Sequence, residues 1–185
     1  MKLLVATDLH GSKSAVDKVV STFHSLGAQK LVLLGDLYYH GPRNGVPSDY
    51  DPMYVANRLN ALSDSIIAVR GNCDSEVDQT ISNFEIQPNA TLDVDGVTFM
   101  FTHGHRYNAG MLPPMGSCQV LMHGHTHVNS IVKVDGVVVV NVGSPSFPKD
   151  GKPAYCVVDV NEHEYEITIF RADTDDMILS TWCVL

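Results

Sequence analysis

The order of strand and helix signals constrains this chain more than any other feature, because it changes halfway along. The first half contains three short apolar runs, at residues 2–8, 30–36 and 65–72, and amphipathic segments separate them. Short apolar runs bounded by polar residues are typical of buried strands. The resulting order is βαβαβ, which predicts three parallel strands in one sheet.

Both intervening segments carry helix signals. Residues 14–27 repeat apolar side chains at helical spacing, and Gly27 supplies a C-terminal stop. Asp51 and Pro52 form an N-cap and N1 pair that opens a second helix, which continues through Leu62.

The second half is typical of antiparallel strands. Residues 90–101 and 129–142 each hold two alternating runs joined by Asp-Gly, a strong hairpin signal. Three further strands are expected at 154–160, 163–170 and 178–185. The prediction is an α/β fold with two mixed sheets packed face to face and helices outside. No repeat, low-complexity tract or linker interrupts the chain, so residues 1–185 are expected to form a single domain.

Charge and cysteine usage narrow the classes of function. The formal charge of −9 and the absence of clustered Lys and Arg argue against extended nucleic-acid binding. The four scattered cysteines form no C-x-x-C pair, which favours a reducing compartment. We see neither a signal-peptide core nor an apolar run approaching the roughly 18 residues of a membrane helix. A cytoplasmic protein without membrane contact is therefore expected.

Potential metal ligands stand at or just past the predicted strand ends, where α/β proteins bind ligands. The side chains at these positions are Asp8, His10, Asp36, Asn72, His103, His105, His123, His125 and His127. Residues i and i+2 of extended chain project to the same side, so Asp8 with His10, and His125 with His127, can each aim two atoms at one point. The mixed nitrogen and oxygen set suits first-row divalent metals.

The order of these motifs resembles the calcineurin-like metallophosphoesterases. The motifs are D8-L-H10, G35-D36, G71-N72-C73-D74, H103-G-H105 and G124-H125-T-H127. The stretches HGPRN at 40–44 and GNCDSEVDQ at 71–79 resemble, more closely, the small bacterial YfcE-type phosphodiesterases. The resemblance implies a four-layer α-β-β-α sandwich and a dinuclear metal centre, most often with Mn²⁺ and with Zn²⁺, Fe²⁺, Ni²⁺ or Co²⁺ as alternatives.

The resemblance also assigns ligands to two metal ions. One ion would be held by Asp8, His10, Asp36 and His127. The other would be held by Asp36, Asn72, His103 and His125. Asp36 would bridge them at the roughly 3.5–4 Å separation that lets both ions grip one phosphate. A bridging hydroxide would then attack a small phosphodiester in line with its leaving oxygen.

Cys73 departs from the broad family pattern, in which a histidine at this position contacts the scissile phosphate. A cysteine phosphatase needs C-x5-R, but the sixth residue after Cys73 is Gln79 and no other cysteine fits, so a cysteine nucleophile is excluded. Cys73 is interpreted as a neutral group beside the substrate, neither ligand nor nucleophile. A thiol protonates an alkoxide poorly, so good leaving groups should be favoured.

Four further residues and one loop have expected roles. His105 is either the missing acid or a rim histidine, and Arg43 either holds the substrate phosphate or lies at a subunit contact. Asp74 and His123 would support the ligands from behind. Residues 141–144 resemble a family loop near the site, although Val142 stands where the family usually has proline.

Three alternatives stay open. A metallo-β-lactamase-like hydrolase would need Asp at position 127, where this chain has His. A non-catalytic scaffold would resemble the retromer subunit that kept the fold while losing ligands, yet every expected ligand is present. A phosphomonoesterase or protein phosphatase would use the same site. Family resemblance and the apolar strands at 154–160 and 178–185 also predict a homo-oligomer, a dimer or tetramer.

Overall fold

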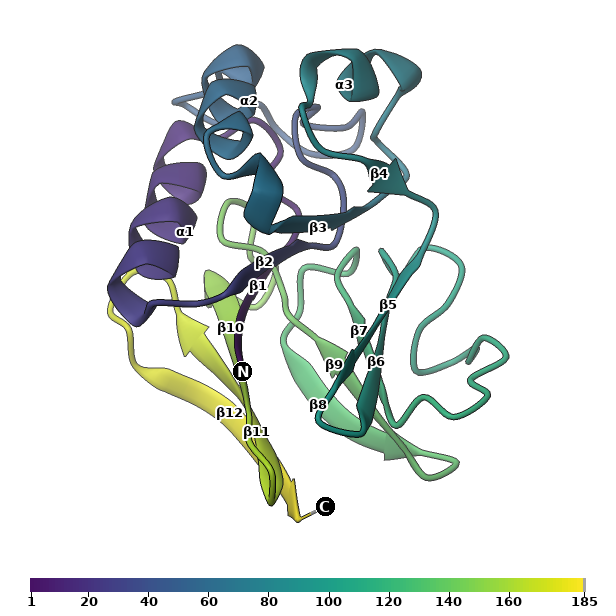
Figure 1. Ribbon diagram of the computed structural model, residues 1–185. Coiled ribbons are helices and arrows are strands. Elements are labelled where there is room, and N and C mark those ends of the chain that lie inside the picture. Colours follow the sequence, from purple (N-terminus) through teal and green to yellow (C-terminus); the bar gives the residue numbers. More distant parts are fainter. Residues whose placement is uncertain (185) are drawn as a thin grey trace.

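The structure of this chain, a computed structural model, describes residues 1–184. Two mixed β-sheets face each other (Figure 1). The larger has the order β12-β11-β10-β1-β2-β3-β4. Its strands are β1 Lys2–Ala6, β2 Lys30–Leu33, β3 Ile66–Val69, β4 Ile86–Gln87, β10 Ala154–Val160, β11 Glu164–Arg171 and β12 Met177–Val184. The smaller has the order β5-β6-β7-β9-β8. Its strands are β5 Ala90–Val94, β6 Val97–Phe101, β7 Val120–His123, β8 Ser130–Val134 and β9 Val137–Asn141.

The predicted βαβαβ order is confirmed. β1 pairs in parallel with β2, and β2 with β3. The connections contain the helices α1 Lys13–Leu26 and α2 Pro52–Asn60, followed by the short 3-10 helix η1 Ser63–Ser65. Gly27 ends α1 with a left-handed φ of 60°, and the Asp51 carboxylate accepts the first-turn amide of Tyr54 at 2.9 Å.

The predicted runs left out three elements besides η1, namely α3, β4 and β7. The helix α3, Glu76–Ile81, is only six residues long and therefore too short to repeat an apolar stripe. β4 has two residues and pairs in parallel with β3. Of the predicted last strand, residues 178–184 lie in β12, and position 185 lies outside the described residues.

Both Asp-Gly hairpins are confirmed. Asp95 and Gly96 have φ values of 50° and 85°, and Asp135 and Gly136 have 49° and 86°. Two consecutive positive φ angles are the requirement of a type I′ turn, whose twist matches that of the flanking strands. The hairpins β5–β6 and β8–β9 follow directly.

The main core lies between the sheets. Alternate residues of most strands point into it, including Leu3 and Val5 from the larger sheet and Phe99 and Phe101 from the smaller one, all fully buried. The intervening residues of the larger sheet, such as Leu4, pack against the helices outside. This period of two is the one expected of strands that separate two buried layers.

Helices cover the outer face of the larger sheet, whereas a loop covers the outer face of the smaller sheet. α1, α2 and α3 precede β4 in the chain and lie beside the larger sheet (Figure 1). On the outer face of the smaller sheet, Leu121 and Val139 pack against Leu112 and Met115 of the loop 102–119. That loop contains three glycines and two prolines, which oppose a regular helix. None of the helices within residues 1–184 has the length and apolar character needed to cross a membrane.

Candidate metal centre

The predicted ligands follow strands of both sheets. Asp8 and His10 follow β1, Asp36 follows β2 and Asn72 follows β3 in the larger sheet. In the smaller sheet His103 follows β6, and His125 and His127 follow β7. Within each sheet these strands are parallel, so their carboxyl ends meet at one edge. Side chains far apart in sequence are thereby brought together.

The backbone at these residues is unusual. Asp8, His10, Asp36, His125 and His127 all have left-handed φ angles between 49° and 70°. Eight non-glycine residues within 1–184 adopt positive φ, and the other three are aspartates at turns. Such angles are costly outside glycine and cluster where function dictates side-chain direction. The loops are thus shaped to aim side chains at the site.

One cluster is formed by Asp8, His10 and His127. His10 Nδ1 donates to the carbonyl of Tyr39 at 2.7 Å, and His127 Nδ1 donates to that of Phe147 at 2.8 Å. Each ring therefore turns its Nε2 lone pair into the site. The two Nε2 atoms are 3.3 Å apart, and they lie 3.6 and 3.2 Å from Asp8 Oδ1.

This first cluster fits a divalent cation. Burial lowers the pKa of His10, but its contacts with the Asp8 carboxylate and the Tyr39 carbonyl outweigh burial and raise the pKa, so a proton on this ring would compete with a cation. When Nε2 of both rings is deprotonated, three acceptor atoms face one another. Asp8 Oδ1 is buried and has no hydrogen-bond partner among residues 1–184. A buried carboxylate oxygen without a partner is costly. A cation bound by the two nitrogens and this oxygen would remove that cost, and the mixed donor set suits Mn²⁺ or Zn²⁺.

The second cluster is formed by Asp36, Asn72 and His103. His103 Nδ1 donates to the carbonyl of Leu34 at 2.8 Å. Its Nε2 lies 3.0 Å from Asn72 Oδ1 and 3.4 Å from Asp36 Oδ2. Burial lowers the pKa of His103, but the carboxylates of Asp36 and Asp8 outweigh it and raise the pKa to about 9. A proton thus occupies this position in the metal-free chain and would compete with a cation.

Asp36 links the two clusters. Its Oδ2 is 3.9 Å from His10 Nε2 as well as 3.4 Å from His103 Nε2. Its Oδ1 accepts the backbone amide of Cys73 at 2.8 Å. One carboxylate oxygen therefore reaches both groups while the other is held by the chain, which is the geometry a bridging ligand needs.

His125 and His105 lie further out. The His125 ring is half-buried, with its centroid 5.1 Å from that of His103, and its backbone amide donates to Asp8 Oδ2 at 2.9 Å. Burial and the positive His103 lower the pKa of His125 to about 4, so the ring is neutral and able to bind a metal. The exposed His105 ring lies 6.2 Å from that of His125 at the rim.

Asp74, Cys73 and His123 surround the ligands. The buried Asp74 carboxylate accepts the backbone amides of Asp36, Leu37 and Gly71 at 2.7–2.9 Å. Burial raises the pKa of the Cys73 thiol to about 12, with contributions from Asp36 and Asp74, so the thiol is neutral. His123 is buried, and its Nδ1 lies 3.0 Å from the carbonyl of Gly124.

Two glycines allow close approach to the carboxylates. A Cβ at Gly71 would lie 2.0 Å from Asp36 Oδ1, and one at Gly124 would lie 2.5 Å from Asp8 Oδ2. Both distances are far below van der Waals contact. The glycines of the Gly-Asn and Gly-His motifs are thus required by packing against the site.

Ser144 of the predicted loop 141–144 contacts the site, and Ser146 and Thr7, for which no role was predicted, do so as well. The hydroxyls of Ser144 and Ser146 donate to the carbonyl of Asp8 at 2.9 and 2.7 Å, which gives the loop after β9 a role in holding Asp8. Thr7 Oγ1 donates to Asp8 Oδ2 at 2.7 Å. The hydroxyl-rich stretch SPS after a strand was the available signal, but only the fold brings it to Asp8.

A cleft of about 490 Å³ opens over the clusters. It is lined by Asp36, Asn72, Cys73, His125 and His127, together with Arg43 and Lys149. The structure therefore brings Arg43 to the predicted ligands. Lys149 had no signal, because the chain between β9 and β10 carries no recognisable motif for it.

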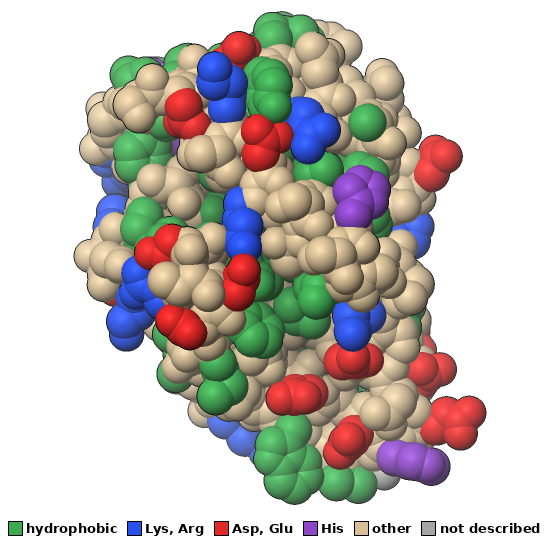
Figure 2. Space-filling view, turned by 90° about the vertical axis from the view of Figure 1, so that its left-hand side faces the viewer, with side chains coloured by type: hydrophobic (Ala, Val, Ile, Leu, Met, Phe, Trp, Pro, Cys, Tyr) green, Lys and Arg blue, Asp and Glu red, His purple; other side chains and the backbone are tan. Residues whose placement is uncertain are grey.

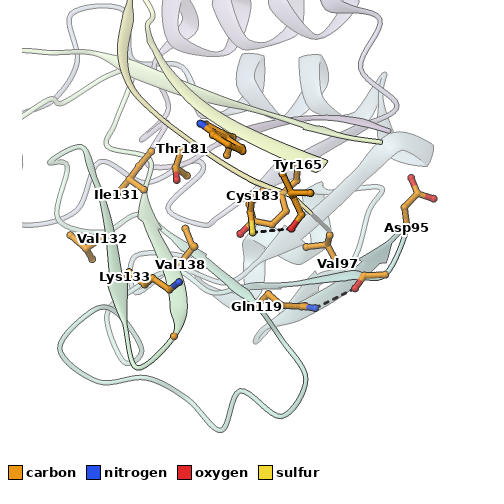
Figure 3. A pocket seen from close by; sticks show the side chains of 14 residues that line it. Asp95, Val97, Gln119, Ile131, Val132, Lys133, Val138, Tyr165, Thr181 and Cys183 are labelled. Atoms are coloured by element: carbon orange, nitrogen blue, oxygen red, sulfur yellow. Dashed lines mark hydrogen bonds between the residues drawn. The ribbon is translucent and has the colours of Figure 1, made fainter. Parts of the chain in front are cut away.

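A larger cavity of about 660 Å³ lies elsewhere. It is lined by Val97, Ile131, Val138, Tyr165 and Cys183, where β12 faces the smaller sheet (Figure 3). None of the predicted ligands lines it. Its lining also includes Asp95, Gln119, Lys133 and Thr181, and within residues 1–184 none of these belongs to a group of side chains that could hold a metal ion.

Comparison with known proteins identifies the family of this chain. The family model for the calcineurin-like phosphoesterase superfamily domain matches residues 1–163. This chain belongs to the calcineurin-like phosphoesterase superfamily. The family and fold class inferred from the motifs are confirmed. Phosphodiesterase YfcE of Escherichia coli K12 is 44% identical over 155 residues, covering 83% of this chain and 84% of that protein.

Solved structures with the same fold extend the match. The E. coli phosphoesterase YfcE superposes with a TM-score of 0.91 at 38% identity, with 98% of each chain covered. Vps29 of Chaetomium thermophilum gives a TM-score of 0.70 at 17% identity, covering 100% of this chain and 98% of that one. The likeness to Vps29 shows a shared fold alone.

Proposed function

We propose that this chain is a metal-dependent phosphodiesterase acting on a small phosphodiester. The observation that carries the proposal is the set of converging acceptor atoms from Asp8, His10 and His127, which includes a buried oxygen without a partner. The 44% identity to a named phosphodiesterase supports the reaction class. We also propose that residues 1–185 act as one domain in the cytoplasm.

The residues that would hold the two divalent cations form two sets. Asp8, His10, Asp36 and His127 would hold one cation, and Asp36, Asn72, His103 and His125 the other. Bound there, two such cations would activate water for in-line attack and neutralise the phosphate charge. Mn²⁺ is our first choice, as the family resemblance implies, and the mixed nitrogen and oxygen ligands would also suit Zn²⁺, Fe²⁺, Ni²⁺ or Co²⁺.

The chain's own residues supply position and charge. Backbone carbonyls hold the Nδ1 atoms of His10, His103 and His127, and this fixes the direction of each Nε2. Arg43 and Lys149 line the cleft and can pair with the charged oxygens of a bound diester. Together they offset the formal charge of −9 at the one place where an anion must bind.

The supporting and acid roles are assigned in the same way. Asp74 would hold the loops of Asp36 and Gly71 together through its three amide contacts. His123 would brace the backbone at Gly124. Cys73 would contact substrate as a neutral thiol, and His105 is the side chain we assign to leaving-group protonation. Burial and the positive His103 lower the pKa of His105, so this ring would be a weak proton source at neutral pH and good leaving groups would be favoured.

Metal analysis with parallel activity assays tests the proposal. The purified chain is expected to contain divalent metal, to hydrolyse bis(4-nitrophenyl) phosphate and to lose this activity after exhaustive chelation. Mn²⁺ should restore it. Activity that survives chelation would contradict the metal requirement, and faster hydrolysis of 4-nitrophenyl phosphate would favour the monoesterase alternative.

We propose, in addition, that two copies associate through β12. This edge strand exposes Met177, Trp182 and Val184, whose side chains are 63%, 67% and 64% exposed. Figure 2 shows hydrophobic side chains reaching the surface low on this face, among acidic ones. If β12 of a second copy paired antiparallel with this strand, the unpaired backbone groups of the sheet edge would form hydrogen bonds. The exposed apolar side chains of the two β12 strands would then lie together. Light scattering that detects only a 20.2 kDa species would exclude the dimer.

A further inference from the structure

A second cleft adjoins the candidate metal centre. It has a volume of about 520 Å³, and its lining includes Arg70, Asn72, Asn89, His105, Arg106 and Tyr107. Asn72 also lines the cleft over the clusters, so the two spaces meet at a predicted metal ligand. The metal centre therefore has room on two sides.

The charge of this second cleft is opposite to that of the chain. Its lining contains two arginines and no aspartate or glutamate. Within residues 1–184 neither guanidinium makes an ion pair, although carboxylates elsewhere pair with Lys2, Lys18, Arg58 and Arg171. In a chain of formal charge −9, two guanidinium groups without carboxylate partners leave a local positive field.

The two arginines are held by the loops that hold the metal site. The backbone amide of Arg70 donates to Gln87 at 2.7 Å, directly after β3 and two residues before Asn72. Arg106 lies in a turn closed by Asn108, whose Nδ2 donates to the Gly104 carbonyl at 2.9 Å.

The same turn packs against the loop that follows β7 and carries His125. A Cβ at Gly104 would lie 2.9 Å from the Gly124 carbonyl and 3.2 Å from the Cβ of His125, so the turn packs closely on the loop that carries this histidine. The position of the arginine cleft relative to the ligands is therefore set by the fold.

We propose that this arginine cleft binds one ester arm of the substrate and selects an arm that carries a second negative charge. The inference rests on the proposed function, because a phosphodiester bound at the clusters has two arms and needs space on two sides. Guanidinium groups pair with carboxylate and phosphate in two-pronged geometry, so either group is suitable. Tyr107 offers a face on which the body of the arm can pack.

Three matched diesters test the charge preference. Each joins 4-nitrophenol to a second phenol through phosphate, and the second phenol carries a 4-carbamoyl, a 4-carboxylate or a 4-phosphonomethyl group. All release 4-nitrophenolate, so the scissile bond is constant. With Mn²⁺, kcat/KM of the wild type is expected to be about tenfold higher for a charged arm, which corresponds to about 1.4 kcal/mol. The better of the two anions identifies the group selected.

Two variants test the arginines: the single variant Arg106→Gln, and the double variant that combines Arg70→Gln with Arg106→Gln. In both, kcat/KM for a charged diester divided by kcat/KM for the neutral diester should fall close to one. Their kcat/KM on the neutral diester should stay at the wild-type value, which also shows that they are folded and metal-loaded. Lys133→Gln is the matched control, because Lys133 is exposed and lines neither cleft. A wild-type ratio of one, or a ratio that the double variant retains, overturns the inference. Failure to hydrolyse the neutral diester would instead reject the proposed function.

Discussion

The substitution Asp36→Asn tests whether Asp36 bridges two metal ions or binds only one. Asp36 Oδ2 lies 3.9 Å from His10 Nε2 and 3.4 Å from His103 Nε2, so it faces both clusters. Asn72 Oδ1 approaches only His103 among the ligand histidines of residues 1–184, at 3.0 Å. Asparagine at position 36 keeps an oxygen for the amide of Cys73. We therefore expect Asp36→Asn to weaken both metal sites and Asn72→Ala to weaken one.

The magnitude follows from binding linkage. At a free Mn²⁺ concentration 100 times the dissociation constant, each occupied site stabilises the folded chain by about 2.7 kcal/mol. A chain of this length shifts its melting temperature by about 2–4 °C per kcal/mol. Each site should thus add roughly 5–11 °C, and two independent sites roughly twice that.

Differential scanning fluorimetry of chelated protein, with and without Mn²⁺, measures this shift. The wild type should show the full increase, Asn72→Ala about half and Asp36→Asn almost none. Asp64→Asn is the control, because Asp64 is exposed and lines neither cleft. Metal content by mass spectrometry should fall in the same order. A full Mn²⁺ shift in Asp36→Asn, or equal losses in the two site variants, would refute the bridging assignment.

Three further predictions concern proton chemistry. Cys73→Ala should leave kcat/KM almost unchanged. Cys73→His should raise kcat/KM most for substrates whose leaving group has a high pKa, because general acid catalysis contributes about 10²–10⁴-fold. If Cys73→Ala abolished activity at normal metal content, the thiol would take part in the reaction. In chelated protein at pH 8, iodoacetamide should label Cys73 far more slowly than the exposed Cys183, because a Cys73 pKa of about 12 leaves roughly one Cys73 side chain in 10⁴ as thiolate. Peptide mass spectrometry measures the labelling of each cysteine, and equal rates would contradict this prediction. The His103 pKa of about 9 exceeds the ordinary 6.5, so the protonated ring stabilises the metal-free fold fully below pH 6.5, and this contribution is lost as pH rises through 9. Urea titrations of chelated protein should therefore show that the free energy of unfolding falls by up to about 3 kcal/mol over this range, and that Asp36→Asn makes the fall smaller.

Local signals in the sequence were sufficient for much of the fold. Asp-Gly specifies two successive positive φ angles, and both predicted hairpins turn at those residues. The caps of α1 and α2 lie within a few residues of the helices they bound, so they too can be read from the chain. α3 escaped detection because six residues cannot establish a period. The loop that covers the smaller sheet has no periodic pattern to read.

The candidate metal centre likewise combines residues that the sequence predicts with contacts that only the tertiary structure decides. Asp8, His10, Asp36, Asn72, His103, His125 and His127 could be named from the sequence because each follows a strand, and parallel strands end at one edge of a sheet. The direction of each histidine was decided only by tertiary structure, since the carbonyls that hold Nδ1 come from Tyr39, Leu34 and Phe147, which lie 20 to 69 positions away. Lys149, the serines that hold Asp8 and the pairing of Arg70 with Arg106 in one cleft likewise depend on contacts between distant segments. The order of strands and helices along the chain depends on local signals, whereas the convergence of side chains on the site depends on how separate loops pack.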